Sequence, residues 1–143
     1  MVSISGDQIV ATAREYIGTP WTHKGRIKGI GVDCVGLLVG VFSELGLEVV
    51  DNLEYSSGDE IELLKKTLKN HGVKRKGKAK KGDVVVFRNT TSVGSQAMLN
   101  HVGIITGDET FIHAWSTPSA MRVVETPLDS FWSGFIVATY GIS

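Results

Sequence analysis

The chain has 143 residues, 42% of them hydrophobic, and its 15 basic residues balance 15 acidic ones. Two independent cores would leave about 70 residues each, so we expect residues 1–143 to fold as a single domain. The balanced charge and ordinary hydrophobic content exclude disorder and a general affinity for nucleic acid, and the longest apolar run, Val35 to Phe42, is far shorter than the roughly 20 residues that span a membrane.

The start of the chain predicts a helix rather than a signal peptide. Residues 1–18 contain no cationic segment followed by an apolar block, so no Sec signal is predicted and we expect synthesis in the cytoplasm. Ser5 or Asp7 can cap a helix that ends at Gly18. The apolar side chains that recur at helical spacing, and that we expect to face inward, are Ile9, Ala13, Tyr16 and Ile17.

Two further helices are predicted before residue 71. Residues 19–31 are rich in glycine, which argues against regular structure. Asp33 can then cap an apolar helix from Cys34 to Leu45, which Gly46 ends. A third helix, from Asp59 to Asn70, has the apolar stripe and the charged face of a surface helix.

After His71 the hydrophobic pattern changes to short apolar runs bounded by turn residues, which predicts strands. Helices followed by strands indicate an α+β fold with a mostly antiparallel sheet of about five to six strands. The basic run at 74–81 is predicted to be a solvated loop, and the polar stretch 89–100 is either a lid over a binding site or a simple connection. The predicted strands are residues 84–87, 102–105, 111–115, 121–125 and 135–140.

Cys34 is the single cysteine of the chain, so it can form no internal disulfide and no thiolate zinc cage. It is either a small core residue or a reactive thiol. Its position in the first turn of a predicted helix favours the second interpretation. The positive end of the helix dipole stabilises a thiolate, and unpaired N–H groups there can bind an oxyanion.

A reactive thiol needs a base, and His101 and His113 lie in or beside neighbouring predicted strands. If Asp108 and Glu109 form a two-residue loop, the two histidines point to opposite faces of the sheet. If the loop also includes Gly107, His113 becomes the diagonal neighbour of His101, and the two imidazoles come within hydrogen-bonding reach. One histidine could then accept the thiol proton while the other orients it. Spacing alone leaves both registers open.

Five segments resemble, in the right order, the motifs of the NlpC/P60 family of cysteine peptidases. They are Gly-Thr-Pro-Trp at 18–21, Gly-Val-Asp-Cys-Val-Gly-Leu-Leu at 31–38, Lys-Gly-Asp-Val-Val-Val-Phe at 81–87, Asn-His-Val-Gly-Ile-Ile-Thr-Gly at 100–107 and Phe-Ile-His-Ala at 111–114. The resemblance covers about residues 8 to 140. It implies a papain-like fold in which the N-terminal helices pack on the sheet.

The resemblance also implies roles for three residues: Cys34 as nucleophile, His101 as base and His113 as the third polar residue. The implied activity is endopeptidase cleavage of peptidoglycan stem peptides in the bacterial cell wall, without a metal or an organic cofactor. The residues of the first two motifs are similar to those of the family branch found among phage and prophage tail proteins. Tail proteins are therefore expected partners, and association with a virion or tail is the expected location.

Two departures from the family pattern affect substrate binding. The family usually has serine after the cysteine, where it is implicated in gripping the free amine of the substrate, and this chain has Val35. Asp33 is left as the polar contact that could take its place, although it can equally be only the helix cap. Trp21 replaces the usual tyrosine and offers an indole N–H in place of a hydroxyl.

Two alternative functions remain at this stage. A thiol-dependent acyltransferase is one, because relatives of this fold transfer acyl groups, but those relatives usually place the histidine before the cysteine. The other is a non-catalytic tail domain that keeps the fold and binds wall or tail partners. Val35 favours this alternative, and the intact set of Cys34, His101 and His113 opposes it.

Overall fold

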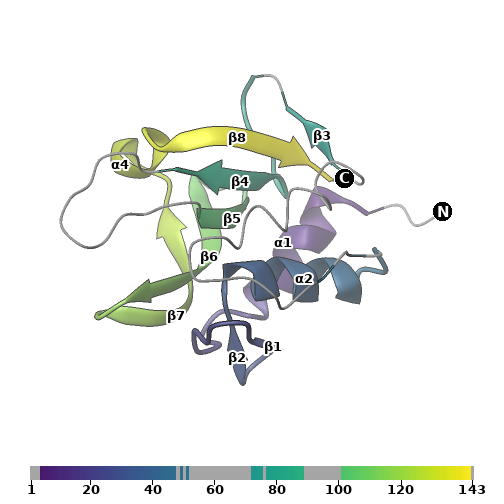
Figure 1. Ribbon diagram of the computed structural model, residues 1–143. Helices are drawn as coiled ribbons and strands as arrows, with labels where there is room; N and C mark the ends of the chain where they lie inside the picture. Colours follow the sequence, from purple (N-terminus) through teal and green to yellow (C-terminus); the bar gives the residue numbers. More distant parts are fainter. Residues whose placement is uncertain are drawn as a thin grey trace.

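The computed structural model describes residues 4–47, 49, 51, 72–75, 77–88 and 101–142. The two long helices precede all strands of the larger sheet in this part of the chain, which agrees with the α+β prediction (Figure 1). The strands form an antiparallel six-stranded sheet, in the order β3-β8-β4-β5-β6-β7, and a separate two-stranded one. The elements are α1 (Gly6–Arg14), β1 (Arg26–Ile27), β2 (Gly31–Val32), α2 (Cys34–Glu44), β3 (Val73–Lys74), β4 (Val84–Phe87), β5 (His101–Ile105), β6 (Thr110–Thr117), β7 (Ala120–Pro127), α4 (Ser130–Ser133) and β8 (Ile136–Gly141).

Helix α1 begins at the predicted cap but ends earlier than predicted. Ser5 and Gln8 form a capping box, in which each side chain accepts a hydrogen bond from the other residue's backbone N–H. The helix ends at Arg14, and residues 15–18 form a turn. The prediction that Ile17 faces inward is therefore wrong: its side chain is 45% exposed, because the helical spacing that would have carried it inward no longer applies.

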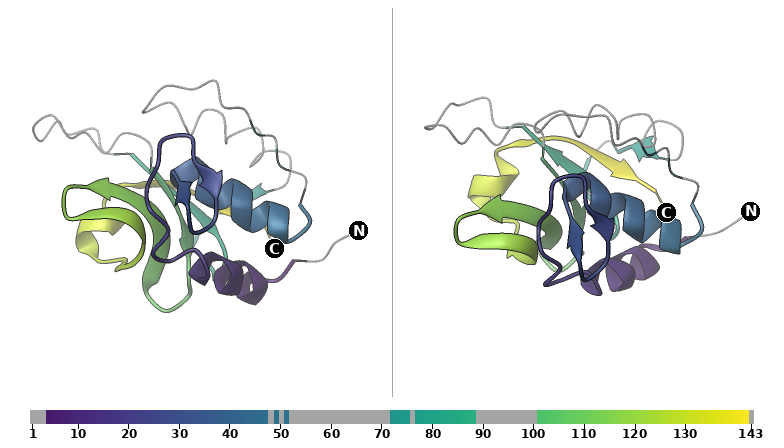
Figure 2. Two further views of the ribbon diagram at one scale, coloured as in Figure 1. Left: turned by 90° about the horizontal axis from the view of Figure 1, so that it is seen from below. Right: turned by 60° about the horizontal axis from the view of Figure 1, so that its bottom comes forward.

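Helix α2 is confirmed between its predicted caps. The Asp33 side chain accepts from the N–H of Gly36, and Gly46 follows the helix in the left-handed conformation with φ of 85°. The prediction that residues 19–31 lack regular structure is wrong, because β1 and β2 pair there as a short antiparallel hairpin. Figure 2 shows α1 and α2 on one side of the sheet, with this hairpin beside α2.

Alternation along the strands divides the sheet residues between two cores. The helix-side core joins α1 and α2 to the sheet, while the α4-side core lies on the opposite face. Sheet residues of the helix-side core are Val84, Val86, Val102, Ile104, Ile112, Ala114 and Val123. The α4-side core consists of Val85, Phe87, Ile105, Phe111 and Trp132.

The turn between β5 and β6 settles the register that the sequence left open. Ile104 pairs with Ile112 and Ile105 with Phe111, and the N–H of Thr106 donates to the Thr110 carbonyl over 3.1 Å. Residues 107–109 therefore form a three-residue loop. Its ends take positive φ values, 88° at Gly107 and 61° at Glu109. This is the register that places the two strand histidines on the same face.

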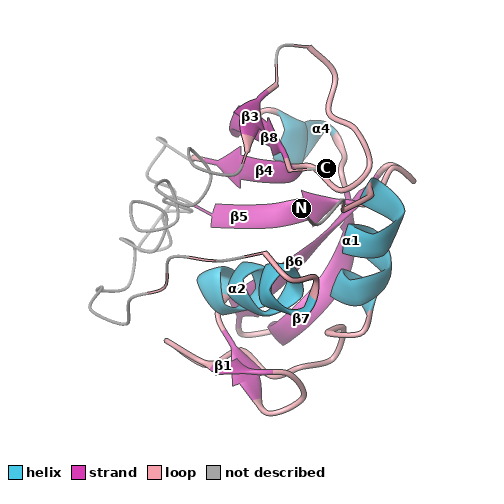
Figure 3. Cartoon of the chain, turned by 90° about the vertical axis from the view of Figure 1, so that its right-hand side faces the viewer, coloured by secondary structure: helices cyan, strands magenta, loops and turns pink. Residues whose placement is uncertain are grey.

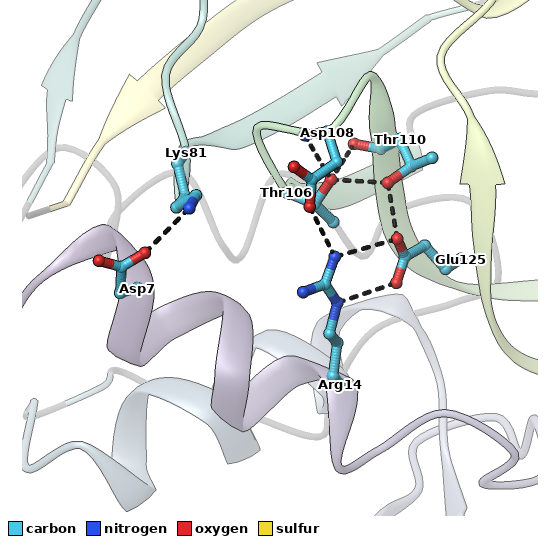
Figure 4. Close-up of polar contacts among 7 residues, drawn as sticks. All are labelled: Asp7, Arg14, Lys81, Thr106, Asp108, Thr110 and Glu125. Atoms are coloured by element: carbon cyan, nitrogen blue, oxygen red, sulfur yellow. Dashed lines mark hydrogen bonds and ion pairs between the residues drawn. The ribbon is translucent and has the colours of Figure 1, made fainter.

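A polar network joins α1 to the sheet at the same turn (Figure 4). Arg14 donates to the carboxylates of Asp108 and Glu125 over 3.0 to 3.2 Å, and Thr110 Oγ1 donates to Glu125 over 2.7 Å. Such solvent-exposed pairs add little to stability individually. The Arg14 pairs connect the end of α1 with the β5–β6 loop and with β7, so they orient the helix.

The basic run at 74–81 is only partly the solvated loop that was predicted. Lys78 and Lys80 are exposed, but Arg75 donates to the fully buried carboxylate of Asp83, which also accepts from the backbone N–H of Lys80. An unpaired carboxylate at this depth would be strongly destabilising. The run therefore contains a structural pair next to its exposed lysines.

Two predictions fall outside the described residues: the third helix at 59–70 and the connection at 89–100. No helix in the part of the chain that the structure describes is long and apolar enough to cross a membrane.

Gly103 on β5 gives a test of the packing between β5 and β6. A Cβ at this position would lie 2.9 Å from Phe111 Cδ2, 3.0 Å from the Ile112 carbonyl oxygen and 3.4 Å from His113 Cβ. We expect Gly103→Ala to lower the free energy of unfolding by about 1–3 kcal/mol, because β6 must move. Urea denaturation measures this change.

Gly134→Ala is the matched control, because its new Cβ would meet only ordinary contacts of 3.4 Å or more. If Gly103→Ala unfolds at the wild-type urea concentration, the close packing of β6 on Gly103 is wrong.

Candidate active site

Cys34 is the first residue of α2 and is 7% exposed. Its position follows from the cap, because Asp33 in extended conformation turns the chain into the helix. The thiol thus lies in the first turn, beside the positive end of the helix dipole, as predicted. Cys34 belongs to the helix-side core, and α2 packs against both β5 and β6 (Figure 3).

The carboxylate of Asp33 is buried and holds the segment before α2. Its Oδ1 accepts from the N–H of Gly36 over 2.8 Å and from Arg26 Nη1 over 3.1 Å, and its Oδ2 accepts from the N–H of Lys24 over 2.8 Å. Arg26 also donates to the carboxylate of Asp51. The helix-cap role considered for Asp33 is confirmed, and contact between Asp33 and a substrate stays a prediction.

His101 and His113 form a hydrogen-bonded pair, which confirms the geometry expected for the three-residue loop. Nε2 of His101 lies 2.7 Å from Nδ1 of His113, and Nε2 of His113 lies 2.8 Å from Thr126 Oγ1. His113 pairs across the strands with Val124, so Thr126, two residues along β7, shares its face. Three side chains from β5, β6 and β7 therefore form one continuous chain of hydrogen bonds.

Aromatic rings surround the two imidazoles on the α4 side of the sheet. Phe87 stacks on His101 with centroids 6.2 Å apart, Phe111 lies 4.3 Å from His113, and Trp132 lies 5.3 Å from His113. Trp115 lies 5.3 Å from both imidazoles. These rings exclude water from the pair and fix both imidazole planes.

Burial of the pair changes its titration. His101 is 9% exposed and His113 is fully buried. Burial lowers the pKa of His101 from 6.5 to about 4, and burial together with the neighbouring His101 lowers the pKa of His113. Both imidazoles are therefore neutral at pH 7, and a neutral imidazole can accept a proton.

The remaining predicted site residues lie in the helix-side core or against it. Val35 is 1% exposed, and Trp21 packs against that core and stacks with His23 at a centroid distance of 6.4 Å. Contact of either residue with a substrate stays a prediction. The strand neighbours of the two histidines, Val102 and Ala114, belong to the same core as Cys34.

Sequence reasoning missed Thr126 and Trp132. Thr126 is the diagonal neighbour of His113 because a two-residue turn at 118–119 pairs His113 with Val124, and the turn residues alone do not fix this register. Trp132 lies on α4, a four-residue helix that Asp129 caps, and a helix this short has too few turns to show periodicity. Among the described residues, no group of three or more His, Cys, Asp or Glu side chains could hold a metal ion.

Comparison with known proteins gives a family and a fold. The sequence profile of the NlpC/P60 family matches residues 18–139. A probable endopeptidase NlpC homolog from Haemophilus influenzae is 32% identical over 114 residues, which are 78% of this chain and 51% of that protein. A gamma-DL-glutamyl hydrolase from Bacillus subtilis is 31% identical over 109 residues, which are 74% of this chain and 22% of that protein. The chain thus spans about half or less of these two relatives.

Solved structures agree on the fold. An NlpC/P60 family protein from Bacillus cereus superposes with a TM-score of 0.70 at 21% identity, covering 98% of this chain and 41% of that one. The NlpC/P60 domain of the peptidoglycan hydrolase SagA superposes with a TM-score of 0.63 at 25% identity, covering 96% of this chain and 99% of that one. The predicted papain-like α+β fold is thereby confirmed.

The burial of His101 predicts how stability depends on pH. Below pH 6.5 the unfolded chain binds a proton at this histidine that the folded chain, with its pKa near 4, does not bind. We expect the free energy of unfolding to fall as the pH is lowered from about 7 to about 4, by on the order of 3 kcal/mol from this group. Urea denaturation at a series of pH values measures the slope.

His101→Gln should make this slope shallower and leave the part that buried His113 contributes, whereas His23→Gln changes an exposed histidine and serves as control. Equal stability of the wild type at pH 7 and pH 4.5 would show that burial does not control the titration of His101.

Proposed function

The chain belongs to the NlpC/P60 family, and from this we propose that it is a cysteine endopeptidase that hydrolyses amide bonds in peptidoglycan stem peptides. The hydrogen-bonded pair of His101 and His113 is the observation that carries the proposal. A non-catalytic domain has no need of two buried imidazoles 2.7 Å apart, because they cost desolvation energy without adding apolar packing. Association with a phage tail is a further proposal, which rests on the wording of the first two motifs.

In the proposed reaction, Cys34 Sγ attacks the carbonyl carbon of the scissile amide and His101 accepts the thiol proton. Backbone N–H groups at the start of α2 stabilise the resulting oxyanion. His101 then gives the proton to the leaving amine, the C–N bond breaks and a thioester remains. A water molecule, deprotonated by His101, hydrolyses the thioester and restores the thiol.

His113 supports this reaction through its hydrogen bond to the proposed base, His101. Its hydrogen bond fixes the imidazole plane of His101 and can stabilise the imidazolium that forms when the thiol proton arrives. Burial keeps His101 neutral at rest, so the base is available at neutral and mildly acidic pH.

The proposed site is poorly equipped to select a substrate with a free amine. Val35 has no hydroxyl, and the carboxylate of Asp33 accepts from Arg26 and from two backbone N–H groups. The guanidinium at 3.1 Å neutralises much of the charge that would attract an ammonium group. We propose that a free amino end contributes little to recognition.

Cys34→Ala should abolish cleavage of purified muropeptides, measured by mass spectrometry of the products, because it removes the nucleophile. The change deletes only one sulfur atom, so we expect the melting temperature to stay within a few degrees of the wild type. Lys28→Gln, a surface change that loses pairs with Glu15 and Glu44, is the control and should cleave normally. A Cys34→Ala variant that cleaves at the wild-type rate would contradict the peptidase assignment.

The selectivity proposal predicts similar kcat/KM for one stem peptide with a free and with a blocked amino end. Arg26→Gln should shift this ratio towards the free amine by roughly threefold to tenfold, because it releases Asp33 Oδ1 from its guanidinium partner. Lys28→Gln in the same hairpin region should leave the ratio unchanged. A strong wild-type preference for the free amine that Arg26→Gln does not alter would remove Asp33 from the argument.

A further inference from the structure

The hydroxyl of Thr126 ends the hydrogen-bond chain that begins at His101. Thr126 Oγ1 lies 2.8 Å from Nε2 of His113, whose Nδ1 lies 2.7 Å from Nε2 of His101. Thr126 lies on β7, at the edge of the sheet, and its side chain is partly exposed. Its own O–H can therefore donate to solvent, which leaves a lone pair of Oγ1 available to accept from His113.

Two arrangements of protons satisfy this chain when both imidazoles are neutral. In the first, His101 Nε2–H donates to His113 Nδ1 and His113 Nε2–H donates to Thr126. In the second, the Thr126 hydroxyl donates to His113 Nε2 and His113 Nδ1–H donates to His101 Nε2. The arrangements differ at His101, because only the first leaves Nδ1 of His101 without a proton and able to act as a base.

The reaction itself selects the first arrangement. Once His101 has accepted the thiol proton, both of its ring nitrogens carry hydrogen, so its Nε2–H must donate to His113. A second positive charge on the adjoining buried ring is too costly, so His113 remains neutral and carries its proton on Nε2. That N–H is buried and needs an acceptor, and Thr126 Oγ1 is in place to accept it.

We propose that Thr126 is a positioning residue of the active site, whose hydroxyl accepts from His113 Nε2–H and so keeps His113 Nδ1 free of a proton to receive His101 Nε2–H. The inference rests on the proposed function for the identity of the base. It goes beyond that function, since it assigns control of the tautomers of both histidines to Thr126, which acts on the base through His113.

Valine at 126 would keep the shape of the side chain and remove the acceptor. The Nε2–H of His113 would then be buried without a partner, a state that costs about 1–3 kcal/mol. His113 avoids it by carrying its proton on Nδ1 instead and donating to His101 Nε2. His101 must then carry its proton on Nδ1, so the basic nitrogen is lost.

The test compares the wild type with Thr126→Val and Thr126→Ser in the full chain labelled with 15N at histidine. Two-bond 1H–15N couplings report which ring nitrogen carries the proton. At pH 7 we expect Nε2–H on both His101 and His113 in the wild type and in Thr126→Ser, and Nδ1–H on both in Thr126→Val. Thr117→Val makes the same substitution in the same hairpin, at a hydroxyl that lies 3.3 Å from Ser119 Oγ, and should keep the wild-type tautomers.

Two kinetic measurements accompany the spectra. Thr126→Val should lower kcat/KM on stem peptides roughly tenfold or more and slow alkylation of Cys34 by iodoacetamide at pH 7 by a similar factor, with Thr126→Ser restoring both. A wild-type His113 that carries its proton on Nδ1 overturns the proposal, and this measurement needs no variant to fold. Unchanged tautomers and rates in Thr126→Val overturn it too.

The outcome separates this proposal from the peptidase assignment. If the wild type cleaves no stem peptide, the assignment fails, while the tautomers and the alkylation rates still show whether Thr126 orients the histidines. If the wild type cleaves and Thr126→Val matches it in tautomers and rates, only the role of Thr126 is lost.

Discussion

The pairing register between β5 and β6 is the constraint on which the candidate site depends. A shift of one residue would move His113 to the helix-side face, among aliphatic side chains, and leave His101 without its partner. The register is held by the three-residue loop at 107–109 and by the Thr106 to Thr110 hydrogen bond. The Arg14 pairs connect the same loop to α1, so the geometry of the imidazoles depends on how the helix packs at the loop end of the β5–β6 hairpin.

Two buried carboxylates hold the segments that lead into the functional elements. Asp33 fixes the chain before α2 and accepts from Arg26 and from two backbone N–H groups. Asp83 fixes the chain before β4 and accepts from Arg75 and from the backbone N–H of Lys80. A buried carboxylate that loses its arginine partner strongly destabilises the folded protein. Each pair therefore keeps its segment in a single conformation. At Asp33 the Arg26 pair also reduces the negative charge of the carboxylate, which is the basis of the proposal that a free amino end contributes little to recognition.

In the proposed mechanism, the surroundings of the imidazoles explain why His101 has a histidine partner. Aromatic rings on the α4 side of the sheet exclude water and lower the pKa of His101, which keeps it neutral but makes its protonated form costly. His113 and Thr126 supply the hydrogen bonds that the excluded water would have given. The chain of three side chains thus replaces solvent with fixed polar groups, so that little reorganisation is needed when charge develops.

The sequence by itself determined the helix cap at Asp33, the strand periodicity, the family motifs and the two histidines, because these signals are local and depend on neighbouring residues along the chain. For the first helix it narrowed the cap to Ser5 or Asp7, and the structure selected Ser5. The sequence could not choose between the two registers of the β5–β6 loop, since both satisfy the same apolar pattern. It also misplaced Ile17, missed the β1–β2 hairpin and did not reveal Thr126 or Trp132. Only the tertiary structure decided these points, because each depends on which strands lie side by side and which groups are shielded from water.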